Sequence, residues 1–339
     1  TRAIVLERER VMQIGKIPET VLKRSVLKKI KVRRPEVIVH AGVGEDCAVL
    51  GPTEDAIVLS TDPITGTSKD IGKLAFHITA NDIASSGAEL VGMLITVIFP
   101  PESSEEELQM IMEELTALAE KYEVEILGGH TEVSAAVNQT LISVTGVGKA
   151  AKGKIVTTGG LRAGQELVVT KWIGLEGSSI LAKEKEEILQ EQLPNEIIET
   201  AKRFDEKLSV VPDSKVAMEI GASAMHDVTE GGIFGALWEM AAASGVGLTV
   251  DLKKIPLRQE TVEICEVFDI NPYMLISSGS LLIGTNYGYQ LVQELERAGI
   301  HAAVIGYATE GNDRIVINGE ERRYLEPPKT DELFRALRF

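Results

Sequence analysis

The stretch Met225-His226-Asp227-Val228-Thr229-Glu230-Gly231-Gly232 stands directly before an amphipathic run and decides how the chain is interpreted. Thr229 can accept hydrogen bonds from the first free N–H groups of a helix. Gly231 and Gly232 remove side chains that would keep an oxyanion away, and the helix dipole favours negative charge there. Asp227 could hold Mg²⁺ against that charge. The stretch therefore predicts a metal and phosphate site at the mouth of a helix. A plain capped helix with a structural aspartate stays open as the alternative.

Helical and strand patterns alternate on both sides of this stretch. The helix that follows it is predicted over residues 232–243, with Ile233, Leu237 and Met240 on one apolar stripe. Other helices are predicted over residues 19–31, 69–87, 103–122, 177–190, 195–208, 213–221, 258–268 and 287–298. Strands are predicted over residues 37–39, 48–50, 57–60, 90–99, 124–127, 140–147, 166–170, 247–250, 280–284 and 302–308. Mixed elements in both halves favour an α+β architecture with α/β character.

A glycine-, lysine- and threonine-rich segment marks the expected domain boundary. It covers residues 146–164, so we predict an N-terminal domain over 1–150 and a C-terminal domain over 151–339. A chain of 339 residues is long enough for two domains of ordinary size.

The composition excludes several classes of protein. The content of 44% hydrophobic and 25% charged residues is typical of a soluble globular protein. No run of about 18 or more apolar residues occurs, so we expect no membrane span. Arg2 and Glu7 place charges where a secretory signal needs an apolar core, and we expect a cytoplasmic protein. The net charge of −16 argues against general nucleic-acid binding, which needs a basic face.

Four further segments carry polar clusters that a hydrophobic core would not need. They are Gly42-Val43-Gly44-Glu45-Asp46-Cys47-Ala48-Val49, Ser60-Thr61-Asp62-Pro63, Thr79-Ala80-Asn81-Asp82-Ile83 and Gly128-Gly129-His130-Thr131-Glu132. Each alone could be a turn or a cap. Together their repeated carboxylates beside glycines fit Mg²⁺ and phosphate, because Mg²⁺ prefers hard oxygen ligands. Histidine and cysteine are too few and too scattered for a zinc site.

These pieces carry a resemblance to a known superfamily. The chain resembles aminoimidazole ribonucleotide (AIR) synthetase (PurM), the hydrogenase maturation protein HypE, selenophosphate synthetase and thiamine-monophosphate kinase. It looks most like the HypE branch and its AIR synthase-related relatives. The matching pieces are those four segments, the opening stretch and Ser278-Gly279-Ser280-Leu281-Leu282-Ile283, in the family's order over about residues 15–310.

The resemblance implies a PurM-type two-domain fold and a nucleotide site. The N-terminal domain would dimerise through its sheet into a barrel, and a mixed α/β C-terminal domain would pack beside it. ATP would lie in the cleft with Mg²⁺ on aspartates. The metal and phosphate acids match, by position, Asp46, Asp62, Asp82 and Asp227, with Asn81 as the partner of Asp82. The nucleotide loop matches Gly128, Gly129, His130 and Thr131, and the phosphates would reach Gly231 and Gly232.

The resemblance also implies an activity. Family members use ATP to phosphorylate an amide, acyl or selenide-type nucleophile, so we expect a ligase, dehydratase or phosphotransferase that activates an amide or carbonyl oxygen. The acceptor would be a small molecule or a protein tail, and Asp227 and His226 are the catalytic candidates. Two alternatives stay open. One is a HypE-like hydrogenase maturation factor that acts with a partner protein, and the other is a non-catalytic nucleotide-binding sensor.

Two departures from the HypE pattern bear on this expectation. HypE proteins resemble one another in a C-terminal tail ending in cysteine, whose thiol carries a carbamoyl group. The segment Leu333–Phe339 contains no cysteine, so we do not expect that reaction on these residues. Ser278-Gly279 also stands where HypE proteins often carry Asn-Glu-Gly, which leaves the place of a general base or metal ligand unfilled.

Several single residues allow two interpretations. Cys47 lies beside the expected metal acids and is a nucleophile or a packed thiol, whereas Cys265 is expected in the core. Two cysteines cannot make a disulfide framework or a closed zinc site alone. His226 could act as an acid or base or be a structural histidine. Lys69 and Lys73 could neutralise phosphate or lie on a solvated helix face.

Overall fold

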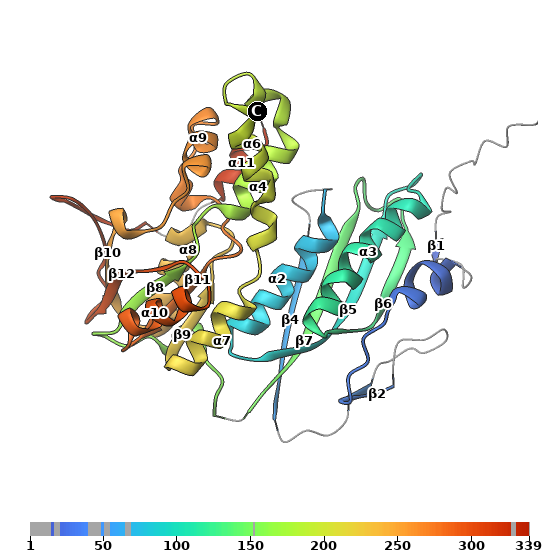
Figure 1. The fold of residues 1–339 in the computed structure, drawn as a ribbon, viewed down its shortest axis with the longest axis horizontal. Coiled ribbons are helices and arrows are strands. Elements are labelled where there is room, and N and C mark those ends of the chain that lie inside the picture. Colours follow the sequence, from blue (N-terminus) through green and yellow to red (C-terminus); the bar gives the residue numbers. More distant parts are fainter. Residues whose placement is uncertain are drawn as a thin grey trace, which may run out of the picture. The chain divides into compact units, whose positions relative to one another are not determined.

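The computed structural model of the chain describes residues 15–16, 21–39, 49–50, 55–64, 69–151, 153–326 and 330–338. Residue contacts divide the chain into two compact units, each of which contains helices and a β-sheet (Figure 1). The first unit comprises Thr1–Thr79 and Glu89–Ala151, and the second comprises Ala80–Ala88 and Lys152–Phe339. The α+β prediction is confirmed.

The first unit is built on a five-stranded sheet. Its strands lie in the order β1-β6-β5-β7-β4, and only β5 and β6 run parallel. The strands are β1 (Gly15–Lys16), β4 (Ala56–Ile64), β5 (Glu89–Phe99), β6 (Glu125–Val133) and β7 (Leu141–Ala150). A separate antiparallel pair consists of β2 (Val37–Val39) and β3 (Val49–Leu50).

Helix α3 (Glu105–Tyr122) covers one face of this sheet and buries Leu108, Ile111 and Leu115. The predicted capping pattern at its start is confirmed. Ser104 accepts a hydrogen bond from the Glu107 N–H, and the Glu107 carboxylate accepts one from the Ser104 N–H. Two short helical turns, η1 (Leu22–Val26) and η2 (Leu27–Lys29), replace the long helix predicted over residues 19–31.

The opposite face of the first sheet carries exposed apolar side chains. Leu59 on the edge strand β4 is 65% exposed, and Leu94 on β5 is 38% exposed. Thr145 of β7 donates a hydrogen bond to the Thr61 hydroxyl of β4 over 2.9 Å, which shows that these side chains share that face. Pro63 is tolerated because β4 lies at the sheet edge, where an N–H is dispensable.

The second unit is built on a seven-stranded sheet in the order β14-β13-β10-β12-β8-β11-β9, in which only β10 and β13 run parallel. The strands are β8 (Glu166–Thr170), β9 (Ala222–Asp227), β10 (Gly247–Asp251), β11 (Leu281–Thr285), β12 (Ala302–Thr309), β13 (Arg314–Asn318) and β14 (Glu321–Tyr324). Strands β9, β13 and β14 are absent from the sequence prediction.

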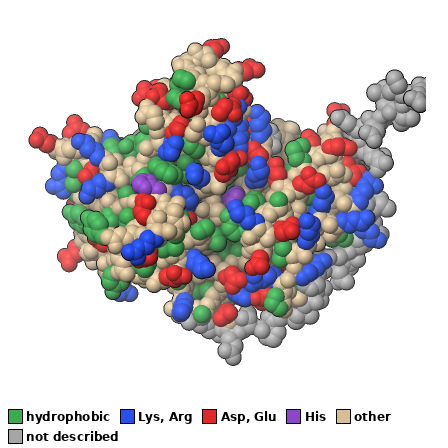
Figure 2. Space-filling model, in the orientation of Figure 1, with side chains coloured by type: hydrophobic (Ala, Val, Ile, Leu, Met, Phe, Trp, Pro, Cys, Tyr) green, Lys and Arg blue, Asp and Glu red, His purple; other side chains and the backbone are tan. Residues whose placement is uncertain are grey.

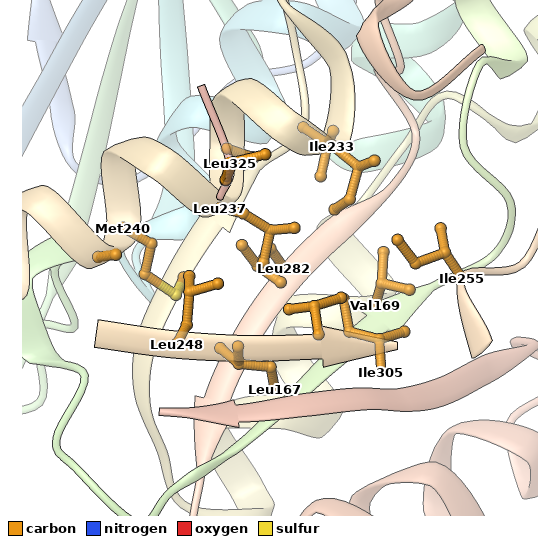
Figure 3. Packing of buried hydrophobic residues seen from close by; sticks show 14 of the residues in the cluster. Leu167, Val169, Ile233, Leu237, Met240, Leu248, Ile255, Leu282, Ile305 and Leu325 are labelled. Carbon is orange, nitrogen blue, oxygen red and sulfur yellow. The ribbon is translucent and has the colours of Figure 1, made fainter. Parts of the chain in front are cut away.

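Helices bury both faces of this sheet. On one face, helix α8 (Gly232–Ser244) packs Ile233, Leu237 and Met240 against Val169 and Leu282 (Figure 3). On the other face, α7 (Val211–Ile220) and α10 (Gly288–Arg297) pack in a second cluster. The remaining helices are α2 (Ile71–Ser85), α4 (Leu175–Glu184), α5 (Glu186–Gln190), α6 (Asn195–Lys202), α9 (Gln259–Val267) and α11 (Glu332–Ala336). The 3-10 turns are η3 (Thr158–Gly160), η4 (Arg203–Lys207), η5 (Leu252–Lys254) and η6 (Pro272–Met274).

Acidic and basic side chains are interspersed over the face of the molecule that Figure 2 presents. Several of them form ion pairs within one unit, such as Lys29 with Glu113 and Arg33 with Glu125 in the first unit. Over the described ranges, none of the helices has both the length and the apolar character needed to cross a membrane.

Candidate functional site

Residues 225–232 form the end of strand β9 and the start of helix α8. The left-handed residue Gly231, with φ of 83°, is the N-cap, so the helix begins at Gly232, three residues after Thr229. The Thr229 side chain does not cap the helix. Its carbonyl instead accepts the Gly232 N–H over 3.0 Å. The prediction that Thr229 caps this helix is wrong, because two glycines with positive φ carry the chain into the helix one turn later.

A carboxylate from the far end of the chain lies at this helix mouth. Asp331 Oδ2 accepts the Gly231 N–H over 2.7 Å, and its Oδ1 accepts the N–H groups of Ile276 and Leu333 over 3.2 and 2.8 Å. Asp331 is 1% exposed. Burial raises the pKa of this carboxyl group, and the three N–H donors oppose that shift. The positive end of α8 therefore already holds an oxyanion from the protein itself.

Gly232 has a packing role at the same place. A Cβ at this position would lie 2.7 Å from the Tyr273 carbonyl oxygen and 2.8 Å from that of Leu275, and its φ is +61°. Only glycine allows the backbone of residues 273–275 to approach the helix this closely. On that side, the space that a side chain would need is occupied by the backbone of residues 273–275.

Two more buried carboxyl groups accompany Asp331. Glu176, in the first turn of α4, accepts the Ser278 N–H over 3.3 Å. Burial raises the pKa of Glu176 to about 7, and the negative charges of Asp331 and Asp227 add to that shift. Asp227 is 5% exposed at the end of β9. Asp227 and Asp331 are thus near enough for their charges to act on Glu176, and the sequence analysis singled out neither Glu176 nor Asp331.

His226 lies on the other side of the same strand. Its Nε2 is 2.8 Å from a carboxylate oxygen of Glu239 on α8, so the imidazole faces the α8 layer. Successive strand residues point to opposite faces of a sheet, and Asp227 therefore points away from His226. The structure does not bring these two catalytic candidates together on one face. Their catalytic roles stay predictions.

A buried lysine ties the loop at Ser278-Gly279 to the sheet. The Lys171 ammonium donates to the Gly279 carbonyl over 2.7 Å and forms an ion pair with Asp213, which is fully buried. Burial lowers the pKa of Lys171, and the Asp213 carboxylate opposes that shift. Lys171 also has a left-handed backbone with φ of 52°. Nothing in the sequence pattern singles out this pair.

Asn81 is fully buried and held by backbone groups of the second unit. Its amide donates to the Leu208 carbonyl over 2.8 Å, and its Oδ1 accepts the Val210 N–H over 2.8 Å. The neighbouring Asp82 is partly exposed. In the described structure Asn81 therefore fixes the segment before α7.

The predicted site residues of the first unit lie on strands. Asp62 lies inside β4 and pairs with Val144, although the sequence reading places it at a strand end. Gly128 to Thr131 lie inside β6, where a loop was expected. The polar side chains of this segment are held in extended backbone, with His130 Nε2 3.0 Å from a carboxylate oxygen of Glu132.

The remaining candidates are placed as follows. Lys73 pairs with Asp70 over 2.6 Å, while Lys69 is exposed. Cys265 is 2% exposed, and burial raises the pKa of its thiol to about 12, so the core prediction is confirmed. Asp46 and Cys47 lie outside the described residues.

Two family matches cover most of the chain. Residues 44–150 match the N-terminal domain of AIR synthase related proteins, and residues 162–318 match the C-terminal domain. The chain belongs to the AIR synthase-related family.

Relatives with curated descriptions place this AIR synthase-related chain near the HypE branch. A putative hydrogenase expression/formation protein of Methanocaldococcus jannaschii is 27% identical over 95% of this chain and 97% of its own length. The carbamoyl dehydratase HypE of Rhodobacter capsulatus is 28% identical over 79% of this chain and 74% of its own length.

A solved structure shows the same fold. The hydrogenase maturation protein HypE in complex with ATP aligns with a TM-score of 0.80 at 20% identity, covering 95% of this chain and 97% of that one. The AIR synthase-related chain thus has the two-domain fold of that protein.

Carboxylate oxygens are the ligands that Mg²⁺ prefers, and Asp227 of this AIR synthase-related chain carries them at the end of β9. Among the described residues, no three acidic, histidine or cysteine side chains converge closely enough to hold a metal ion. An ion on Asp227 would therefore complete its shell with phosphate oxygens, water or residues outside the described ranges, as Mg²⁺ usually does.

Proposed function

We propose that the protein is an ATP- and Mg²⁺-dependent enzyme that phosphorylates an amide or carbonyl oxygen. The observation that carries the proposal is the buried carboxylate Asp227, at the family's motif position, on a chain that matches both family domains. The names of the relatives support the chemistry, since one is a carbamoyl dehydratase and a protein of the same fold is solved with ATP.

The proposed roles follow the family positions. Asp46, Asp62, Asp82 and Asp227 would hold Mg²⁺, which would neutralise charge on the transferred phosphate. Residues 128–131 would contact the nucleotide, and Asn81 would fix the backbone beside Asp82. We also propose residues 1–150 as the ATP-binding and dimerising domain and 151–339 as the C-terminal domain. The ranges of the two family matches support that division.

The proposal is tested by Asp227→Asn. We expect this variant to bind Mg²⁺-ATP about tenfold more weakly by calorimetry, because a charge-assisted contact contributes about 1.5–3 kcal/mol. Glu230→Gln is the matched control, since Glu230 is an exposed acid three residues further along the same motif. Circular dichroism checks that both variants are folded. Unchanged ATP binding by Asp227→Asn, or an equal loss in both variants, would contradict the assigned role.

Turnover is measured separately, as phosphate released from ATP with a panel of small amides and carboxylates. Release that depends on one class of acceptor supports the enzyme and identifies its acceptor class. ATP binding without release from any acceptor would favour the nucleotide sensor instead.

A second candidate function is a hydrogenase maturation factor that acts with a partner protein. It is favoured by the M. jannaschii relative, whose description is hydrogenase expression/formation and which matches over nearly its whole length. Purified hydrogenase maturation proteins would be mixed with this protein and the mixture separated by size. Absence of a stable complex, with and without ATP, would argue against this function.

We further propose that the protein is a homodimer formed through the face of the first sheet that lies opposite α3. Leu59, Ile57 and Leu94 are exposed apolar side chains there, and exposed apolar strand faces mark association sites. Leu59→Lys is expected to convert the dimer into a monomer in size-exclusion chromatography with light scattering. Met110→Lys is the control, because Met110 is 57% exposed on helix α3. A wild-type monomer, or a dimer that survives Leu59→Lys, would refute the proposal.

A further inference from the structure

The second unit contains a cavity beside helix α8 that the proposed chemistry does not use. Its volume is about 220 Å³, and the first turn of α8, turn η6 and strands β13 and β14 surround it. Its apolar lining comes from Phe234, Met274, Val316 and Leu325. By liquid volume this space equals about seven water molecules. It therefore suits a ligand smaller than a nucleotide and smaller than most drug-sized molecules.

An aromatic ring gives the cavity a flat wall. Phe234 of α8 lines it. Tyr273 stacks on Phe234 with ring centroids 5.3 Å apart and planes 13° apart, which fixes the Phe234 ring. Gly231 and Gly235, one helical turn apart, also line the cavity and place no side chain in it. Planar groups pack well against such fixed rings.

One cation lies at this cavity. Arg323 of β14 lines it and pairs with Val316 of the core on the α8 face, so its side chain lies on the α8 side of the sheet. The acid Glu326, which follows β14, also lines the cavity. Burial raises the pKa of the Tyr273 phenol, and the Arg323 charge opposes that shift. The α8 dipole does not supply the anion site, because Asp331 already accepts the Gly231 N–H. Arginine presents a planar fork of donors that matches a carboxylate.

We propose that this cavity binds a small carboxylic acid with a flat, apolar body, with the carboxylate on Arg323 and the body against Phe234. The site adjoins the helix mouth at Gly231, but its anion would be held by Arg323 and not by the Gly231 N–H, which Asp331 accepts. It does not depend on ATP chemistry, so its failure would leave the proposed function standing.

The experiment uses the chain's own fluorescence. The protein has two tryptophans, and Trp238 lies one helical turn beyond Phe234. Trp172→Phe leaves Trp238 as the single reporter in the full chain. Phenylacetate is the probe. Benzyl alcohol is the control that has the aromatic ring but no charge, and acetate is the control that has the carboxylate but no ring. A fragment of about ten non-hydrogen atoms is expected to bind with a Kd near one millimolar. Calorimetry gives a second, independent measurement.

Arg323→Gln tests the charge, and Arg322→Gln is the matched control on the same exposed strand. We expect Arg323→Gln to weaken phenylacetate binding about tenfold without changing benzyl alcohol binding, while Arg322→Gln changes neither. Phe234→Leu, which keeps an apolar side chain, should weaken both ring probes. The proposal is overturned if benzyl alcohol binds as tightly as phenylacetate, or if Arg322→Gln has the larger effect. It is also overturned if both methods show no saturable phenylacetate binding up to about 10 mM.

Discussion

An alanine at position 129 is expected to unfold the five-stranded sheet of the first unit. A Cβ on Gly129 would lie 1.8 Å from the Ile95 carbonyl oxygen and 2.6 Å from the Ile95 carbonyl carbon. The β5 backbone cannot move away, because β6 and β7 pair with it on both sides. The φ of +146° adds a conformation that side chains rarely adopt. We expect a loss of more than about 4 kcal/mol, which is exceptional for one substitution.

Gly128→Ala is the matched control for this change. Its φ of +153° is similar, but a Cβ there meets only the end of the Leu94 side chain at 3.7 Å. We expect a cost of about 1–3 kcal/mol from the backbone alone. Hydrogen exchange of peptides from β5 and β6 would measure both variants. Equal protection in the two variants would contradict the steric argument.

The two variants also bear on whether Gly128 and Gly129 contact a nucleotide. Trp172 and Trp238, the two tryptophans of the chain, both lie in the second unit, so their emission shows whether that unit stays folded. A Gly129 variant that loses ATP binding together with sheet protection says nothing about a nucleotide contact. Gly128→Ala is therefore the better probe of ATP binding at this segment.

Replacing Glu176 by glutamine is expected to change how stability depends on pH. Burial raises the pKa of Glu176 from 4.5 to about 7 in the folded protein. Between these values the unfolded chain has lost the proton and the folded chain keeps it, so wild-type stability falls as pH rises. Above pH 7 both states are ionised and this loss is complete. Over pH 5.5 to 8.5 the Glu176 contribution to that fall is about 2 kcal/mol.

Glu176→Gln lacks this titration. Its stability relative to wild type should therefore rise by about 2 kcal/mol over the same range. Urea unfolding followed by tryptophan emission measures it, because both tryptophans report on the second unit. Glu187→Gln, an exposed acid on the neighbouring helix α5, is the control and should follow the wild-type pH dependence. A stability difference between Glu176→Gln and wild type that does not change with pH would show that the buried carboxyl does not titrate in this range.

The sequence predicts elements whose local signals are strong. Strand β8 has the predicted bounds, and α3 begins at the capping box that Ser104 and Glu107 predict. Strand β9 is missed because Ala-Ser-Ala-Met-His-Asp contains residues of low strand propensity. Its pairing with β11 stabilises it, and that neighbour is more than fifty residues away. Thr229 is misread as the cap because the sequence prediction omits β9, which extends to Asp227.

The site is predicted less completely than the fold. The sequence proposes Asp227 from its motif, and its role stays a prediction. Asp331 lies 100 residues from the Gly231 N–H that it binds, and no local pattern joins them. Glu176 looks like an ordinary acid in the first turn of a helix, where the dipole favours it. Only its burial distinguishes it from an exposed acid. The sequence also does not predict the ion pair of Lys171 and Asp213, because sequence patterns do not show which charged side chains are buried together.

Helix α2 has a consequence for how this chain can be divided. The residues of this helix up to Thr79 belong to the first unit. The rest of the helix lies in the segment Ala80–Ala88, which belongs to the second unit. A recombinant fragment starting at residue 152 would lack the Asn81 amide, and the Leu208 carbonyl and Val210 N–H would lose their partner inside a buried region. Along the sequence, the chain enters the second unit at Ala80, returns to the first at Glu89 and enters the second again at Lys152. A gene fusion, a circular permutation or an exchange of halves between homologues must therefore keep the nine residues Ala80–Ala88 together with the C-terminal half.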